Sequence, residues 1–180
     1  VDRTLAAAGT SWRTIVGKLG FRAPLPDVRS TFNGGNSKYD IYLADIGDLG
    51  YYGYCTSDDP DLNSPLTPQT SAVSAYCVLD DDYSGTQFPA LTPRKNLQVT
   101  AAHEFLHAVQ FGYDFYEDRW LMESSAAWVE DVVYDAVNDN RQYLPTSPLR
   151  LPLTPVDKAS KAHHDTKRIL LGLDEVTCGQ

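Results

Sequence analysis

The first half of the chain combines one helical stretch with several short strands. Apolar residues recur at helical spacing over residues 3–19, and Gly20 ends that pattern, which predicts an opening helix. Short apolar and aromatic runs separated by Gly- and Pro-rich breaks then predict strands. The predicted strands are 28–32, 40–46, 51–55 and 73–79. This part of the sequence therefore predicts a helix followed by a small sheet.

Helical periodicity dominates the second half. Thr92 and Pro93 are typical of a helix N-cap and first turn, and apolar residues recur at helical spacing as far as Gly112. A further helix is predicted from about 120 to 138. The prolines between 145 and 157 require an extended or turned chain. The predicted order is helix, sheet, two helices and loop, which places the protein in the α+β class.

Length and composition limit the partners that this chain can have. Its 180 residues, 42% of them hydrophobic, suffice for one domain with a core, and we predict a single domain over 1–157 with a tail of uncertain structure over 158–180. No apolar run approaches eighteen residues, so we expect no membrane span. A formal charge of -9 would repel phosphate backbones, so we expect no nucleic-acid partner. The oligomeric state is left open.

Cysteine usage bears on the compartment. Cys55 and Cys77 lie in strand-like aromatic sequence, and Cys178 lies near the end of the chain. We favour a Cys55–Cys77 disulfide in an oxidising compartment, and therefore a secreted or extracytoplasmic protein; the alternative is buried reduced thiols in a cytosolic protein. The chain begins with Val1 rather than Met, so we expect a trimmed or mature form.

The helix predicted between Thr92 and Gly112 contains a motif typical of metal sites, His103-Glu104-Phe105-Leu106-His107. Two histidines four apart on a helix are separated by about 40° and roughly 6 Å, so both imidazoles can reach one cation at the ~2.0 Å distance that zinc prefers. Glu104 is next to the first histidine and is close enough to take a proton from a metal-bound water. The alternative is an amphipathic helix whose histidines pair with carboxylates on its polar face.

A catalytic zinc site needs a third protein ligand and one open position. The downstream candidates are Asp114, Glu117, Asp118, Glu123, Glu130 and Asp131. We favour Glu123, because the sixteen residues that separate it from His107 allow the next helix to return to the metal. Glu130 is seven residues further on, on nearly the same helix face, and is interpreted as an outer-shell residue.

Together, the histidine motif and Trp120-Leu121-Met122-Glu123 resemble the zinc metallopeptidases called zincins, specifically the gluzincin branch. The chain is also similar to a bacterial family of secreted metallopeptidases, the MXAN_6640 type. That likeness spans most of residues 10–157 and rests on the segments 40–45, 53–55, 102–114 and 120–131.

The resemblance implies a zincin-like fold, in which a small mixed N-terminal sheet packs on the active-site helix and a ligand-bearing helix follows. It also implies a Zn²⁺ site made by His103, His107 and Glu123, with Glu104 as the catalytic general base. The expected function is hydrolysis of peptide bonds in a peptide or protein substrate. The strand at 51–55 is our candidate for pairing with substrate, with a tight hairpin as the alternative.

Several questions stay open at the level of sequence. The competing function is a non-catalytic binding or adhesion module stabilised by zinc. Two acidic clusters, 58–61 and 80–82, offer oxygen ligands suited to calcium but lack the spacing of a defined calcium loop. A further donor to the reacting carbonyl oxygen is expected. The candidates for it are Tyr113, Tyr134, Tyr143, His163 and His164.

Overall fold

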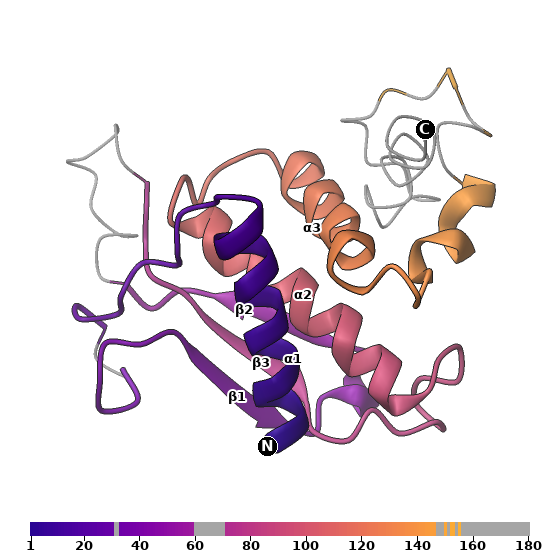
Figure 1. The fold of residues 1–180 in the computed structure, drawn as a ribbon, viewed down its shortest axis with the longest axis horizontal. Helices are drawn as coiled ribbons and strands as arrows, with labels where there is room; N and C mark the ends of the chain where they lie inside the picture. The colour runs from indigo at the N-terminus through magenta and orange to yellow at the C-terminus, as the bar shows by residue number, and fades with distance from the viewer. Residues whose placement is uncertain (31–32, 60–70, 147–149, 151, 154, 156–180) are drawn as a thin grey trace. The chain divides into compact units, whose positions relative to one another are not determined.

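The computed structural model describes residues 1–30, 33–59, 71–146, 150, 152–153 and 155 (Figure 1). The chain falls into two compact units, Val1–Tyr116 and Glu117–Gln180, and each is described by itself. The prediction of one domain over residues 1–157 stays a prediction.

The first unit contains a mixed three-stranded sheet in the order β1-β3-β2. The strands are β1 (Asp40–Ala44), β2 (Gly53–Thr56) and β3 (Tyr76–Asp80). β1 runs parallel to β3 and β2 runs antiparallel to it. The central strand β3 is the most buried, which accounts for its nearly continuous apolar sequence. The predicted mixed sheet is confirmed.

Two long helices of this unit lie over the same face of the sheet (Figure 1). The opening helix consists of α1 (Asp2–Trp12) continued by a π-helical segment η1 (Arg13–Lys18). The predicted stop is confirmed, since Gly20 has a φ of +78°, a conformation that favours glycine. The second helix, α2, spans Pro93–Phe111, and its N-cap Thr92 accepts a hydrogen bond from the Lys95 N–H.

The core lies between these helices and the sheet. Leu79 of β3 packs with Leu97 and Ala101 of α2 and with Ala7 of α1. Further along α2, the Phe105 ring contacts the rings of Trp12 and Tyr39, each at a centroid distance of 5.6 Å. α2 is buried over most of its length, so its side chains are held in place on several sides.

All four strand predictions in this unit are corrected. β2 is Gly53–Thr56 rather than 51–55, and β3 is Tyr76–Asp80 rather than 73–79. No strand forms at residues 28–30, because Val28 and Arg29 lie in a turn closed by a hydrogen bond from the Ser30 N–H to the Asp27 carbonyl; residues 31–32 lie outside the described part. β1 ends at Ala44 rather than at Ile46. The buried Asp80 carboxylate accepts hydrogen bonds from the N–H groups at 46 and 47, which turns the chain into the short 3-10 helix η2 (Gly47–Leu49).

The second unit is helical in its described part. α3 spans Arg119–Tyr134 and is followed by the 3-10 helix η4 (Asp139–Thr146). The predicted helix therefore exists but ends four residues early, and η4 includes residue 145, for which we expected an extended or turned chain. Across both units the α+β class is confirmed. Among the described residues, no helix has the length and apolarity needed to cross a membrane.

A disulfide joins Cys55 of β2 to Cys77 of β3, as predicted. The two residues are direct partners in the antiparallel register, so the bond ties the edge strand to the central strand. The bridge closes a loop with a sequence separation of 22. In the chain-entropy account, constraining such a loop in the unfolded chain stabilises the fold by about 3 kcal/mol.

We therefore expect the double variant Cys55→Ala/Cys77→Ala to lose about 3 kcal/mol of unfolding free energy. Urea unfolding of the oxidised protein and of the variant measures this difference. Cys178→Ser is the matched control, because it removes a thiol outside the bonded pair. An equal midpoint and slope for the double variant and the wild type would contradict the stabilising role.

Candidate metal centre

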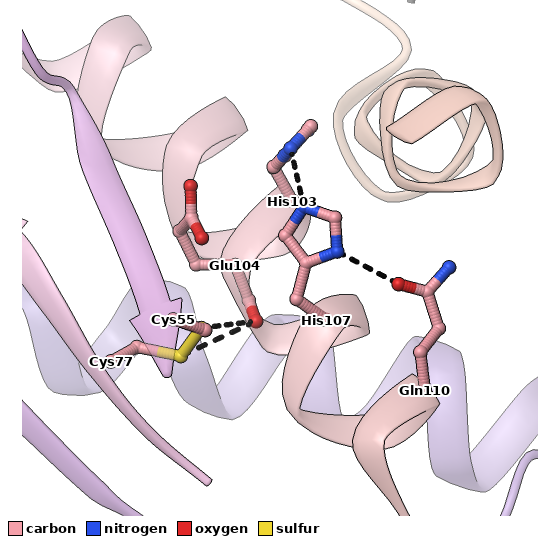
Figure 2. The surroundings of a disulfide bond; sticks show 6 residues. All are labelled: Cys55, Cys77, His103, Glu104, His107 and Gln110. Atoms are coloured by element: carbon pink, nitrogen blue, oxygen red, sulfur yellow. Dashed lines mark hydrogen bonds between the residues drawn. A yellow bond between two sulfur atoms is a disulfide. The ribbon is translucent and has the colours of Figure 1, made fainter. Parts of the chain in front are cut away.

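His103 and His107 project side by side from α2, one helical turn apart (Figure 2). Both are buried, with exposed fractions of 3% and 7%. Their Nε2 atoms are 3.0 Å apart, and the ring planes are nearly perpendicular at 83°. The predicted convergence of the two imidazoles is confirmed: each presents the same ring nitrogen to one point in space.

This pair fits a tetrahedral metal ion. Two nitrogen ligands at ~2.05 Å from a tetrahedral zinc ion are about 3.3 Å apart, which differs little from the separation observed here. Imidazole nitrogen is also a donor that zinc accepts readily. The Nε2 atoms of His103 and His107 therefore have the spacing and the donor chemistry that two zinc ligands need.

A third polar side chain orients one of these rings. The Nδ1 atom of His107 lies 2.8 Å from Oε1 of Gln110, three residues further along α2 (Figure 2). An amide oxygen can only accept a hydrogen bond, so this contact places the proton on Nδ1. Nε2 of His107 is then left with a lone pair directed toward His103.

Glu104 is a buried carboxyl group, with 6% of its surface exposed. Among the residues that the structure describes, its Oε2 atom is buried and has no hydrogen-bond partner. A buried polar oxygen without a partner costs free energy, so such atoms are rare in folded proteins and mark positions where a ligand or water is expected. Figure 2 shows this side chain leaving α2 on the side of the strands.

The strand next to Glu104 approaches closely because it carries a glycine. A methyl group on Gly53 of β2 would lie 3.0 Å from Cγ of Glu104 and 2.8 Å from Cγ2 of Thr100. Both separations are shorter than ordinary contacts between carbon atoms. Gly53 therefore allows β2 to lie directly against the side-chain stem of Glu104, a role that spacing in the sequence does not reveal.

Two tyrosine hydroxyl groups are influenced by the same carboxylate. Burial raises the pKa of Tyr39 well above its usual range, and the charge of Glu104 raises it further. Burial likewise raises the pKa of Tyr83, and the charges of Asp80 and Glu104 act in the same direction. Both phenols are therefore neutral at physiological pH and add no negative charge near Glu104.

The disulfide is in contact with the backbone of α2 at the same residue. The Sγ atoms of Cys55 and Cys77 lie 2.9 and 3.4 Å from the carbonyl oxygen of Glu104 (Figure 2). Disulfide sulfur carries no proton, so these are packing contacts rather than hydrogen bonds. They support the helix from the sheet side at Glu104.

The predicted carboxylate ligand belongs to the second unit. Glu123 and Glu130 are both half-buried residues of α3. Their spacing of seven residues places them on nearly the same helix face, about 10.5 Å apart along the axis. That Glu123 rather than Glu130 is the third ligand stays a prediction.

The proposed donors to the carbonyl oxygen are only partly described. The Tyr113 hydroxyl accepts a hydrogen bond from the Arg22 N–H, which lowers its pKa, and the Arg22 guanidinium lies 3.7 Å from the centre of its ring. Tyr134 lies in the second unit at the end of α3. The side chain of Tyr143, and His163 and His164, lie outside the described part. No donor is selected by these observations.

Carboxylates of the two acidic clusters accept hydrogen bonds from loop residues of the fold. Asp45, Asp80 and Asp81 bring carboxylate oxygens within 4.8 Å of one another. Asp80, however, also accepts a hydrogen bond from the Tyr83 N–H, so both of its oxygens are engaged by backbone groups. In the other cluster Asp58 accepts a bond from the Ser30 hydroxyl, and residues 60–61 lie outside the described part. We therefore propose no calcium at either cluster.

Comparison with protein-family models, curated proteins and solved structures finds no match. The assignment of function therefore rests on the site itself. Sequence reasoning missed Gln110; it noted Gly53 as a place where a substrate backbone could come near, but not the contact of Gly53 with Glu104. An amide three residues beyond the second histidine was a usable signal, because residues i and i+3 are neighbours on a helix. The contact of Gly53 with Glu104 depends on tertiary structure and had no local signal.

Proposed function

We propose that this protein is a zinc-dependent endopeptidase. The observation that carries the proposal is a buried carboxyl oxygen of Glu104 without a partner in the described structure, on the same helix as two convergent imidazoles. A histidine pair alone would also suit a structural metal site. A buried acid next to it has no structural benefit, whereas hydrolysis requires a base at this place.

In the proposed site, Nε2 of His103 and Nε2 of His107 hold the metal, and the carboxylate of Glu123 completes the protein ligands. This donor set of two imidazoles and one carboxylate is characteristic of catalytic zinc and leaves one coordination position open. When bound, zinc supplies Lewis-acid polarisation of the scissile carbonyl and lowers the pKa of water toward neutrality.

Glu104 carries the proton through the reaction. It takes a proton from the attacking water and then delivers that proton to the leaving amine, so that the carboxyl group returns to its starting state. Its burial supports this role, because a water-poor surrounding strengthens its interaction with the reacting groups. Gly53 and the disulfide confine the residue from the strand side.

The edge strand β2 is the proposed binding place for the substrate backbone. β2 pairs with β3 on one side, and among the described strands nothing pairs with its other side. An extended peptide can add to such an edge through main-chain hydrogen bonds. The same strand contacts Glu104 at Gly53, so a peptide paired with β2 would lie close to the base.

The disulfide supports a secreted or extracytoplasmic location, because such bonds persist in oxidising compartments. Peptide and protein substrates are the proposed partners. The alternative, a binding or adhesion module with a purely structural zinc ion, leaves the buried carboxylate of Glu104 without a use.

Metal removal and re-addition tests the proposal. We expect one zinc per chain by elemental analysis, cleavage of casein by the zinc-loaded protein, loss of cleavage after dialysis against 1,10-phenanthroline, and recovery with stoichiometric zinc. The non-chelating isomer 1,7-phenanthroline is the matched control and is expected to leave cleavage intact. Purified protein without bound zinc, or cleavage that survives complete zinc removal, would overturn the assignment.

A further inference from the structure

We propose that Gln110 is a positioning residue that holds His107 in the tautomer required for metal binding. The proposal rests on the proposed function, because it concerns the same zinc site. Its basis is the 2.8 Å contact between Nδ1 of His107 and Oε1 of Gln110.

A metal-binding imidazole must offer a lone pair. The nitrogen that faces the shared point is Nε2 of His107, since it lies 3.0 Å from Nε2 of His103. In a neutral imidazole, one nitrogen carries the proton and the other carries the lone pair. An acceptor at Nδ1 keeps the proton there and leaves Nε2 free to bind metal. Gln110 supplies this acceptor.

The contact between the two imidazoles is compatible with this tautomer of His107. Two Nε2 atoms at 3.0 Å form a hydrogen bond only if one of them carries a proton. With the His107 proton on Nδ1, a hydrogen bond between the two rings requires the proton of the metal-free pair to be on Nε2 of His103.

The backbone of α2 fixes Gln110 relative to His107. The two residues are three positions apart on the same helix, so their side chains are neighbours. The carbonyl of Gln110 accepts hydrogen bonds from the N–H groups of Tyr113 and Asp114, at 2.8 and 2.9 Å. These bonds do not involve the side chain, so substitution of Gln110 leaves the end of the helix intact.

The test compares three variants of the full chain. Gln110→Leu removes the acceptor, Gln110→Glu retains one, and Gln98→Leu makes the same change at another half-buried position of α2. All three residue types have similar helix propensities. The readouts are the zinc dissociation constant, measured by competition with a chromophoric chelator, and the ¹⁵N shifts of the His107 ring in metal-free protein.

We expect Gln110→Leu to weaken zinc binding by about 10- to 100-fold, the usual cost of losing an outer-shell partner. The His107 ¹⁵N shifts should change from an Nδ1–H form to a mixture of tautomers. Gln110→Glu should retain the Nδ1–H form and tight binding, and Gln98→Leu should match the wild type. An unchanged dissociation constant and tautomer in Gln110→Leu would overturn this inference alone. A wild-type protein that binds no zinc would overturn the proposed function together with it.

Discussion

Glu104→Gln is expected to retain one bound zinc and to lose peptide cleavage by a factor of about 10²–10⁴, the usual contribution of a general acid–base group. Gln has nearly the same shape as Glu, so the packing against Gly53 and Thr100 is preserved. The amide cannot take a proton from the attacking water. Casein cleavage and zinc stoichiometry, measured on the same preparation, separate loss of the base from loss of the metal.

Glu175→Gln is the matched control, since it makes the same chemical change at a glutamate that is not among the candidate ligands. It should cleave at the wild-type rate. If Glu104→Gln also cleaves at that rate with zinc bound, Glu104 is not the base and the proposed mechanism is wrong. A variant that has lost both zinc and cleavage would instead assign Glu104 to metal binding.

The metal-free protein provides an independent readout for the same substitution. A carboxylate that is buried without a partner costs more free energy than a neutral amide in the same place. We therefore expect metal-free Glu104→Gln to melt at a higher temperature than the metal-free wild type. Such a gain in stability at the expense of activity is typical of catalytic residues.

The elements predicted best are those with local stop and start signals. α2 begins and ends within one residue of the prediction, because the Thr92 cap and Gly112 act on neighbouring backbone groups. The strand predicted at 28–32 is wrong over its described residues, since the turn closed by Ser30 and Asp27 outweighs the strand preference of the apolar side chains. The shortening of β1 depends on Asp80, which is distant in sequence. The local sequence pattern of a strand gives no information about such a long-range contact.

The same distinction applies to the site. The convergence of His103 and His107 follows from helix geometry, and it was predicted from their spacing. The surroundings of Glu104 were not predicted, because Gly53 and the disulfide contact α2 from a different part of the sequence. The identity of the third ligand depends on how the chain between 112 and 118 turns, which the helical periodicity of α3 does not determine. Two substitutions on α3 decide that point.

Glu123→Ala removes one of the three proposed protein ligands, so it is expected to weaken zinc binding strongly. Loss of a residue that only contacts a ligand usually weakens metal binding by about 10- to 100-fold, and we expect the loss in Glu123→Ala to be larger. Glu130→Ala is the matched comparison on the same helix face. The two carboxylates are about 10.5 Å apart along α3, so one ion with ligand bonds of ~2.1 Å is bound by only one of them. Zinc competition titrations of both variants, with circular dichroism to verify the helices, make the comparison.

The pattern of losses identifies the ligand. The proposed site is supported if Glu123→Ala loses zinc binding while Glu130→Ala binds zinc within about 100-fold of the wild type. Glu130 would then be an outer-shell residue at most. The reverse pattern would transfer the ligand role to Glu130 and contradict the assignment of Glu123. If both variants bind as the wild type does, neither Glu123 nor Glu130 is the third ligand, and the assignment of Glu123 is wrong. The third ligand would then have to be one of the other downstream candidates, Asp114, Glu117, Asp118 or Asp131.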